Sequence, residues 1–251
     1  MKMQLASSEH LAEEVPVALV FNGISHAVMM ATPLHLEDFA LGFALSEGLI
    51  DQASQLYGVE VLEQALGMEV HIDIAAQCEA RLKERKRSMA GRTGCGLCGT
   101  DSLAQVKLSL PQAPVVNVDV QAMQRAHAGL RALQPLKLQT GATHAAAWSD
   151  MKGVIHIVRE DVGRHNAVDK LIGEAALRGA LPLVGSLLLL SGRCSFELVQ
   201  KAAAAGFAAI ACVGAPSSLA VETSERLGIC LIGFLRERSF NVYTEQSVVQ
   251  R

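Results

Sequence analysis

The chain has 251 residues, of which 50% are hydrophobic, 19% are charged and 4% are aromatic, and its formal net charge is −3. This composition excludes a disordered protein, because there is enough apolar surface for a substantial core. The small negative charge gives no general indication of nucleic-acid binding. The longest apolar runs, such as 181–190, are about half of the ~20 residues that a membrane span needs.

The first fifteen residues contain acidic side chains and lack the apolar run of a signal peptide. We therefore expect a cytosolic protein whose six cysteines remain thiols. Only Cys95 and Cys98 have a spacing that suggests chemistry. The others are predicted to be inert, three of them as small buried side chains beside apolar segments: Cys78, Cys194, Cys212 and Cys230.

The first third of the chain predicts an α+β unit. Asn22-Gly23 interrupts the apolar run 15–30 and predicts a hairpin, because this dipeptide accepts the positive φ angles of a tight turn. Thr32 followed by proline predicts the N-cap and first residue of a helix that ends near Gly48. Two strands are expected next, over 57–63 and 68–75.

A change of composition marks a connector over residues 81–118. Six basic residues fall within twelve positions, opposed by Glu84 alone, and glycines then surround Cys95 and Cys98. Such a segment is expected to be exposed and mobile, with a helix following over about 119–133. The basic residues are Arg81, Lys83, Arg85, Lys86, Arg87 and Arg92.

The second half alternates apolar strands with amphipathic helices, after a hairpin over 145–158. This pattern predicts βαβ crossovers and a mainly parallel sheet that is covered on both faces. Helix boundaries are indicated by Ser195 as an N-cap, Pro216 at a helix start, and Gly206 and Gly228 just after helix ends. We therefore predict an N-terminal α+β domain (1–80), the connector (81–118) and an αβα ligand-binding domain (119–251).

Polar and basic residues follow each predicted strand of this sheet. Carboxyl ends of parallel strands meet at one edge, so these loops should share one rim, and three of them lead into helix N-termini that favour anions. Arginine suits phosphate oxygens, so the rim predicts a phosphorylated or nucleotide ligand. The absence of a Walker loop and of GxGxxG disfavours ATP hydrolysis and Rossmann-type NAD binding. The residues are Arg159, Arg164, His165, Asn166, Ser191, Gly192, Arg193, Arg236 and Arg238.

Other readings of these residues stay open. Each arginine alone could be a salt-bridged surface residue, with Glu160 and Asp161 available as partners. His144, at the end of a polar loop, could donate to a ligand, act as an acid or base, or be structural. Four further histidines are predicted to be structural or surface residues: His26, His35, His71 and His127.

The pair Cys95 and Cys98 allows three interpretations. A structural zinc site needs four ligands, and a second pair is missing unless two copies of the chain share a site. Zinc-dependent deamination is excluded because no glutamate stands two residues after His144 and no proline precedes Cys95. A thioredoxin-like dithiol is disfavoured by the flanking glycines, which favour a loop. Sulfur transfer fits the upstream cations, which lower the pKa of a thiol and attract a charged partner.

Several motifs together resemble one known family. The chain is similar, from Val15 to Thr244, to the FdhD family of formate dehydrogenase accessory sulfurtransferases. The resemblance rests on TGCGLCG (93–99), TGATHA (140–145), REDVGRHNAVDK (159–170), SGR and SFE (191–197), and GF through FNVY (233–243). The sequence departs from the family at Ala142, where a second glycine is more usual.

The resemblance implies a fold, a cofactor and partners. The expected fold is a three-layer, cytidine-deaminase-like αβα domain with a mixed, mainly parallel sheet, plus the smaller N-terminal domain, in a cytosolic homodimer. The expected activity is transfer of sulfur from a cysteine desulfurase to the molybdenum (or tungsten) bis(molybdopterin guanine dinucleotide) cofactor of a formate dehydrogenase apoenzyme. No structural metal, nucleic acid or membrane is implied. Besides Thr143, His144 and the rim residues, the cofactor contacts would be Phe234, Leu235, Arg236, Glu237, Arg238 and Ser239.

Within this family the first cysteine of the motif bears a persulfide, which corresponds to Cys95, and Cys98 is an accessory. The resulting hypothesis has the Cys95 thiolate, supported by Arg92, attack the outer sulfur of the desulfurase persulfide. The loop then swings over the strand-end rim and passes the sulfur to the metal. Two alternatives remain: a carrier or chaperone that only binds the cofactor, and a dithiol oxidoreductase in which Cys95 and Cys98 cycle as a disulfide.

Overall fold

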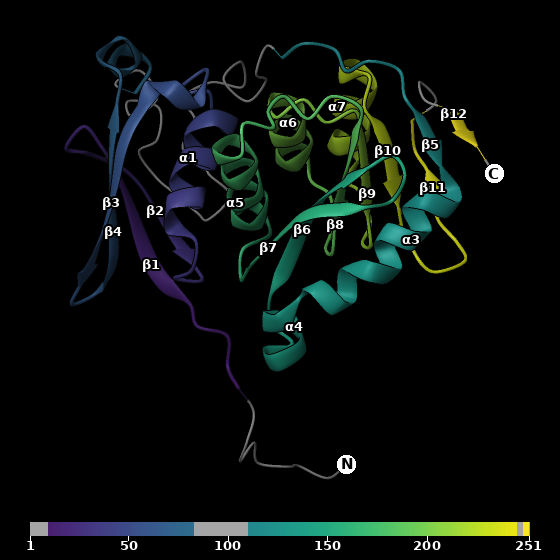
Figure 1. Ribbon diagram of the computed structural model, residues 1–251, viewed down its shortest axis with the longest axis horizontal. Coiled ribbons are helices and arrows are strands. Elements are labelled where there is room, and N and C mark those ends of the chain that lie inside the picture. The colour runs from purple at the N-terminus through teal and green to yellow at the C-terminus, as the bar shows by residue number, and fades with distance from the viewer. Residues whose placement is uncertain (1–9, 83–109, 245–247, 251) are drawn as a thin grey trace.

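The computed structural model describes residues 10–82, 110–244 and 248–250, which form two main β-sheets with helices between and around them (Figure 1). Cys95, Cys98 and most of the basic run lie outside the described residues. No helix in these ranges has the length and hydropathy of a membrane span. Most of the predicted connector (81–118) therefore lies outside the described residues, and the predicted domain boundaries stay predictions.

The first sheet contains four strands in the order β2-β1-β4-β3. The predicted hairpin is confirmed, because Asn22 and Gly23 have φ angles of 46° and 74° and join two antiparallel strands. The strand β4 pairs in parallel with β1, and its own hairpin with β3 matches the second prediction. The bounds are β1 (Val15–Phe21), β2 (Ile24–Ala31), β3 (Leu56–Gln64) and β4 (Gly67–Ile74), with 3-10 turns η1 (Ala53–Gln55) and η2 (Ala76–Cys78).

The first helix starts later than predicted. The helix α1 (Leu36–Ser46) has His35 as its N-cap residue, in a left-handed conformation, so the assignment of Thr32 as N-cap was wrong. Thr32 is instead held by the second half of the chain. Its amide donates to Asp161 Oδ2 at 3.1 Å and its carbonyl accepts from Lys170 Nζ at 2.8 Å. These long-range contacts cannot be read from a local capping pattern.

The second sheet contains six strands in the order β11-β10-β9-β8-β6-β7. The strands β7, β8, β9 and β10 run in one direction, but only β8–β9 and β9–β10 pair in parallel, because the antiparallel β6 lies between β7 and β8. The sheet is mixed, and its description as mainly parallel holds for strand direction and not for strand pairing. The bounds are β6 (His144–Asp150), β7 (Ile155–Asp161), β8 (Ser186–Leu190), β9 (Ala209–Cys212), β10 (Cys230–Gly233) and β11 (Asn241–Val242).

Helices cover both faces of this sheet. Leu188 and Leu190 pack toward α5 (Arg164–Leu177), α6 (Phe196–Ala204) and α7 (Ser218–Leu227). Leu187 and Leu189 face the helix α3 (Val120–Leu130), which lies within the predicted helix over 119–133 and is capped by Asp119, whose side chain accepts from two backbone amides. The result is a three-layer arrangement, and its likeness to cytidine deaminases stays a prediction. A small third sheet pairs β5 (Asn117–Asp119) with β12 (Val248–Gln250).

The two main sheets are joined through α1 and α5, which lie side by side between them (Figure 1). Glycines allow the two backbones to touch: a Cβ atom on Gly42 would lie 1.7 Å from the Asp169 carbonyl oxygen, and one on Gly173 would lie 1.9 Å from that of Asp38. Buried ion pairs flank the crossing. Lys201 Nζ lies 2.8 Å from Asp169 Oδ1, and although burial lowers the pKa of Lys201, the charges of Asp169 and Glu47 outweigh it and raise this pKa above its ordinary value.

Candidate functional site

The loops after β7, β8, β9 and β10 share one rim of the second sheet, as predicted. His144 at the start of β6 pairs with Asp161 at the end of β7. A Cβ atom on Gly192 would lie 3.0 Å from His144 Nδ1, and the amide of Gly214 donates to the Gly192 carbonyl at 2.8 Å. Phe234 in turn donates its amide to the Gly214 carbonyl at 3.0 Å. The four loops therefore form one continuous row.

Burial keeps His165 neutral at this rim. Its side chain lies at the start of α5, with Nε2 3.2 Å from Ser195 Oγ and 4.0 Å from Glu197 Oε2. Burial, followed by the charges of Arg164 and Lys201, lowers the pKa of His165 to about 3. A neutral imidazole can accept or donate a hydrogen bond but carries no charge for a phosphate. The hydroxyl of Ser195 is directed to this ring and does not cap α6.

Two charged side chains beside His165 each have one atom without a hydrogen bond. Among the described residues, Arg164 Nε and Glu197 Oε2 are both buried atoms without a partner. Buried polar atoms in native proteins are nearly always satisfied, so an exception calls for an explanation such as a ligand or a bound water. Arg164 begins α5, where free backbone amides also favour an anion.

The side of the rim near His144 is positively charged. The pKa of His144 is lowered, first by burial and then by the charges of Lys137, Arg164 and Arg193, while Asp161 opposes them. Arg193 is exposed, and the hydroxyl of Ser191 accepts from the Ala145 amide at 2.7 Å, which fixes the loop after β8 to β6. The arrangement suits an anion near His144 and Arg164.

The loop after β10 presents an aromatic side chain in an unusual conformation. Phe234 has a φ of 52° and is 42% exposed, although an L-residue with this φ is strained and a phenyl ring gains from burial. Arg236 stabilises the loop itself, because its guanidinium donates to the carbonyls of Val213 and Leu235 at 2.6 and 2.8 Å. Leu235 is buried, so it supports the loop, whereas three further predicted contacts are exposed: Glu237, Arg238 and Ser239.

Three residues that were predicted to contact the cofactor bond to other parts of the protein instead. Arg159 donates through Nε to Asp38 Oδ2 at 2.7 Å and pairs with Glu174 at 3.0 Å, so it joins β7 to α1 and α5 and not to the rim. Asn166 is buried and donates to the Met30 carbonyl at 2.9 Å. Thr143 is buried and donates to Glu160, which also accepts the amides of Leu136 and Lys137.

Sequence reasoning missed Glu197 and treated His127 as isolated. Glu197 stands two residues after Ser195, inside the SFE motif, and this spacing was the only signal for it. The pKa of His127 is lowered by burial and then by Arg236, which places α3 beside the loop after β10. His26 is also not isolated, since its ring lies 5.6 Å from Phe21 and 6.0 Å from Phe43, measured between ring centroids.

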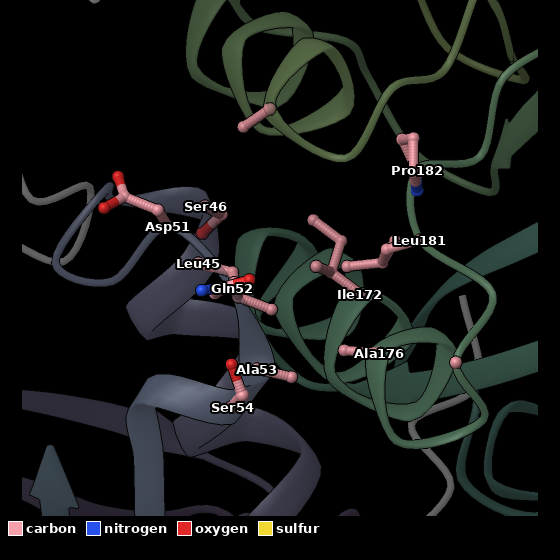
Figure 2. Close-up of a pocket in the computed structure, with 12 residues that line it drawn as sticks. Leu45, Ser46, Asp51, Gln52, Ala53, Ser54, Ile172, Ala176, Leu181 and Pro182 are labelled. Carbon is pink, nitrogen blue, oxygen red and sulfur yellow. The ribbon is translucent and has the colours of Figure 1, made fainter. Parts of the chain in front are cut away.

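A cavity of about 430 Å³ lies away from the rim, near the C-terminal ends of α5 and α6 (Figure 2). Asp51 lines it and pairs with Arg81 at 2.7 Å. At the far side of the same edge, the Ala113 amide donates to the carbonyl of Leu227, the last residue of α7. The described residues on both sides of 83–109 are therefore held near the C-terminal ends of the helices α5, α6 and α7, on the side of the molecule opposite the rim.

The site is thus a rim of loops with a positively charged side near His144, on a mixed α/β protein with two main sheets. Comparison with known proteins is more specific: the model of the FdhD/NarQ family matches residues 12–250. The sulfur carrier protein FdhD of Bordetella bronchiseptica is 50% identical over 240 residues, covering 94% of this chain and 86% of that protein. The protein of the same name from Cupriavidus necator is 49% identical over 247 residues, covering 98% and 85%.

A solved structure agrees. The crystal structure of a formate dehydrogenase accessory protein from Desulfotalea psychrophila matches with a TM-score of 0.71 and 26% identity, covering 94% of this chain and 89% of that one. The chain belongs to the FdhD/NarQ family.

Proposed function

We propose that this protein is a sulfur carrier that accepts sulfur from a cysteine desulfurase as a persulfide on Cys95. It delivers the sulfur to a molybdenum or tungsten bis(molybdopterin guanine dinucleotide) cofactor, which it binds as a substrate for a formate dehydrogenase. Support comes from relatives at about half identity that are named sulfur carrier protein FdhD, and from a neighbour titled a formate dehydrogenase accessory protein. In this proposal the chain is a sulfurtransferase that acts in the cytoplasm.

One observation carries the cofactor-binding half of the proposal. The buried and unpaired Nε of Arg164 lies at the N-terminus of α5, on a rim whose other side carries the strained and exposed Phe234. A nucleotide has complementary parts, because its phosphate accepts from arginine and from helix amides and its base stacks on an aromatic ring. Neutral His165 and Ser195 supply hydrogen bonds without further charge.

The sulfur step needs no external oxidant. The Cys95 thiolate attacks the outer sulfur of the donor persulfide, the donor S–S bond breaks, and the donor cysteine leaves as a thiolate. The four described cysteines are unsuited to compete, because all are buried, and burial raises the pKa of Cys212 to about 11. In the second transfer the outer sulfur leaves Cys95, and the substrate metal supplies the two electrons that convert it to sulfide.

The position of the connector bears on the proposed swing. Both attached ends lie on the side opposite the rim, but Cys95 is 13 residue steps from Leu82 and 15 from Leu110, which correspond to ~43 and ~50 Å of extended chain at ~3.3 Å per residue. Chain length therefore permits Cys95 to reach the rim of its own copy or of a partner copy. The expected homodimer stays a prediction, which the molar mass in solution tests.

Mass spectrometry after incubation with a cysteine desulfurase and cysteine tests the sulfur half. Wild type and Cys98→Ala are expected to gain one sulfur atom, and Cys95→Ala is not. If Cys95→Ala gains the sulfur atom and Cys98→Ala does not, then Cys98 bears the persulfide and Cys95 is the accessory cysteine. Full formate dehydrogenase activity with Cys95→Ala would favour the carrier alternative, and a disulfide with no adduct would favour the dithiol oxidoreductase.

Titration with guanosine diphosphate tests the rim. Arg164→Gln is expected to weaken binding by about 10–100-fold, the loss of a charge-assisted hydrogen bond. Arg226→Gln, an exposed arginine in the last turn of α7, is the matched control and should bind as wild type. If Arg164→Gln and Arg226→Gln bind guanosine diphosphate with equal affinity, the rim is not the nucleotide-binding site.

A further inference from the structure

An exposed arm projects beside the rim and contains no fully buried apolar residue. It comprises residues 131–142, with the turn η4 (Arg131–Leu133) and the helix α4 (Pro135–Thr140), and we call it the α4 arm. It lies apart from the other helices, at the bottom of Figure 1. Gln134 is its only buried residue, while Leu133 and Leu138 are 47% and 58% exposed. Short helices are normally held by a buried apolar face, which is missing here.

Polar bonds hold the α4 arm in a defined shape. The buried carboxylate of Glu160 accepts the amides of Leu136 and Lys137 at 2.9 and 2.8 Å. At the other end of α4, Thr140 donates its hydroxyl to the Leu136 carbonyl and accepts the amide of Ala142. The exposed leucines are therefore presented on an ordered support, which lowers the entropy cost of binding a partner.

The α4 arm is also positively charged. From residue 120 to residue 149 the chain contains Arg125, Arg131 and Lys137 and no aspartate or glutamate. The nearby carboxylate of Glu160 is used in the cap. The arm leads directly into His144, whose pKa is lowered in part by Lys137, so it borders the proposed cofactor site.

We propose that the α4 arm docks the apoenzyme that receives the cofactor, through an apolar patch surrounded by carboxylates on that protein. The inference rests on the proposed function, since a carrier must release a bulky cofactor directly into its acceptor. Charge complementarity argues for this occupant and against a second copy of the chain. A twofold contact between two copies of the chain would place this patch on the same patch of the other copy. The positive charges of Arg131 and Lys137 would then face the positive charges of the other copy.

The test uses the full-length protein and purified formate dehydrogenase apoenzyme, immobilised for affinity measurement. Leu138→Glu and Lys137→Glu are expected to weaken binding at least ~10-fold, as for residues central to an interface. The matched control is Leu66→Glu, because Leu66 is 89% exposed in the turn between β3 and β4 and far from the rim. It should bind as wild type.

Two further measurements separate this inference from the proposed function. Sulfur loading of Cys95 and binding of guanosine diphosphate should be unchanged in Leu138→Glu. If wild type itself shows neither, the proposed function is overturned. Glu160→Gln, which weakens the cap and leaves both leucines, should reduce apoenzyme binding as well. The inference is overturned if wild type does not bind the apoenzyme or if Leu138→Glu binds as Leu66→Glu does. A change in molar mass with Leu138→Glu would likewise overturn it, since a second copy would then be the occupant.

Discussion

At the scale of single residues, the rim combines a neutral histidine, His165, with Arg164 and Glu197, which each have one buried atom without a hydrogen bond. Burial, and then the positive charges of Arg164 and Lys201, disfavour a proton on His165, whose Nε2 lies 4.0 Å from Glu197 Oε2. The pKa of His165, about 3 in the folded protein, is far below 6.5, the ordinary pKa of a histidine. The unfolded chain therefore takes up a proton at this residue before the folded protein does, so His165 opposes folding in mild acid.

The consequence is a pH dependence with a defined sign. Stability should be full above pH ~6.5 and fall as the pH decreases toward ~3, with His165 accounting for a loss of about 2 kcal/mol between pH 7 and 5. Urea unfolding of wild type and His165→Asn at several pH values measures it. The variant should lose about 2 kcal/mol less over this interval, whatever its stability at pH 7. If the free energy of unfolding of wild type and of His165→Asn changes equally with pH, His165 does not cause the loss of stability in acid.

One motif shows how far single residues could be predicted. REDVGRHN was expected to supply cofactor contacts, and Arg164 and His165 do lie at the rim. Arg159 and Asn166 from the same motif are used by α1 and β2, which are more than a hundred residues away in the chain. The loop could be placed from the strand before it, but the direction of each side chain depends on partners that no local pattern reveals.

At the scale of elements, the decisive contact is the crossing of α1 and α5. Both helices carry a glycine where the backbones meet, and both have rows of small or apolar residues beside it. Such a contact tolerates no Cβ atom, because the atoms that it would meet belong to the backbone of the facing helix, in a close-packed core. The glycines therefore set the distance between the two main sheets.

Alanine substitution tests this crossing. Gly42→Ala and Gly173→Ala should each lower the free energy of unfolding by about 2–4 kcal/mol, because the helices must separate. The control is Gly129→Ala in α3, where the nearest atom to a new Cβ would be Ile155 Cδ1 at 3.9 Å. Its higher helix propensity should raise stability by about 0.5–1 kcal/mol. Similar losses in all three variants would show that the crossing is not special.

The elements themselves were largely predictable. Apolar alternation and turn residues located the hairpins, and the strands and helices of the second half fell where their periods indicated. The exceptions have a common cause: α4 is held by Glu160 from β7, and β5 pairs with a strand near the end of the chain. Both depend on residues distant in sequence, which single-segment periodicity does not register.

At the scale of the whole molecule, the described parts of the two halves share a core. Ala176 of α5 belongs to the core of the first sheet, and Leu45 of α1 packs against the cores of both. Two ion pairs cross the same boundary, Arg159 with Asp38 and Lys201 with Glu47, and Lys170 donates across it to the carbonyl of Thr32. Separating the halves would break these contacts and expose both cores to water, so we expect a single cooperative unit.

Two probes in different halves test cooperativity. Trp148, the only tryptophan, lies in the second sheet, and Cys78 is buried in the core of the first. In a Cys95→Ala, Cys98→Ala background, tryptophan fluorescence and maleimide labelling of Cys78 should report the same urea midpoint. Labelling at clearly lower urea would show that the first half unfolds alone.

The buried cysteines have a consequence for a protein that handles reactive sulfur. With a pKa of about 11, Cys212 is a thiolate in only ~1 of 10,000 molecules at pH 7, against a few per cent for a free cysteine of pKa ~8.5. The higher nucleophilicity of a thiolate with a higher pKa offsets only part of this difference, so a persulfide that reached Cys212 would still exchange more slowly than at an ordinary cysteine. Burial of the four described cysteines thus limits the loss of reactive sulfur to side reactions in the core.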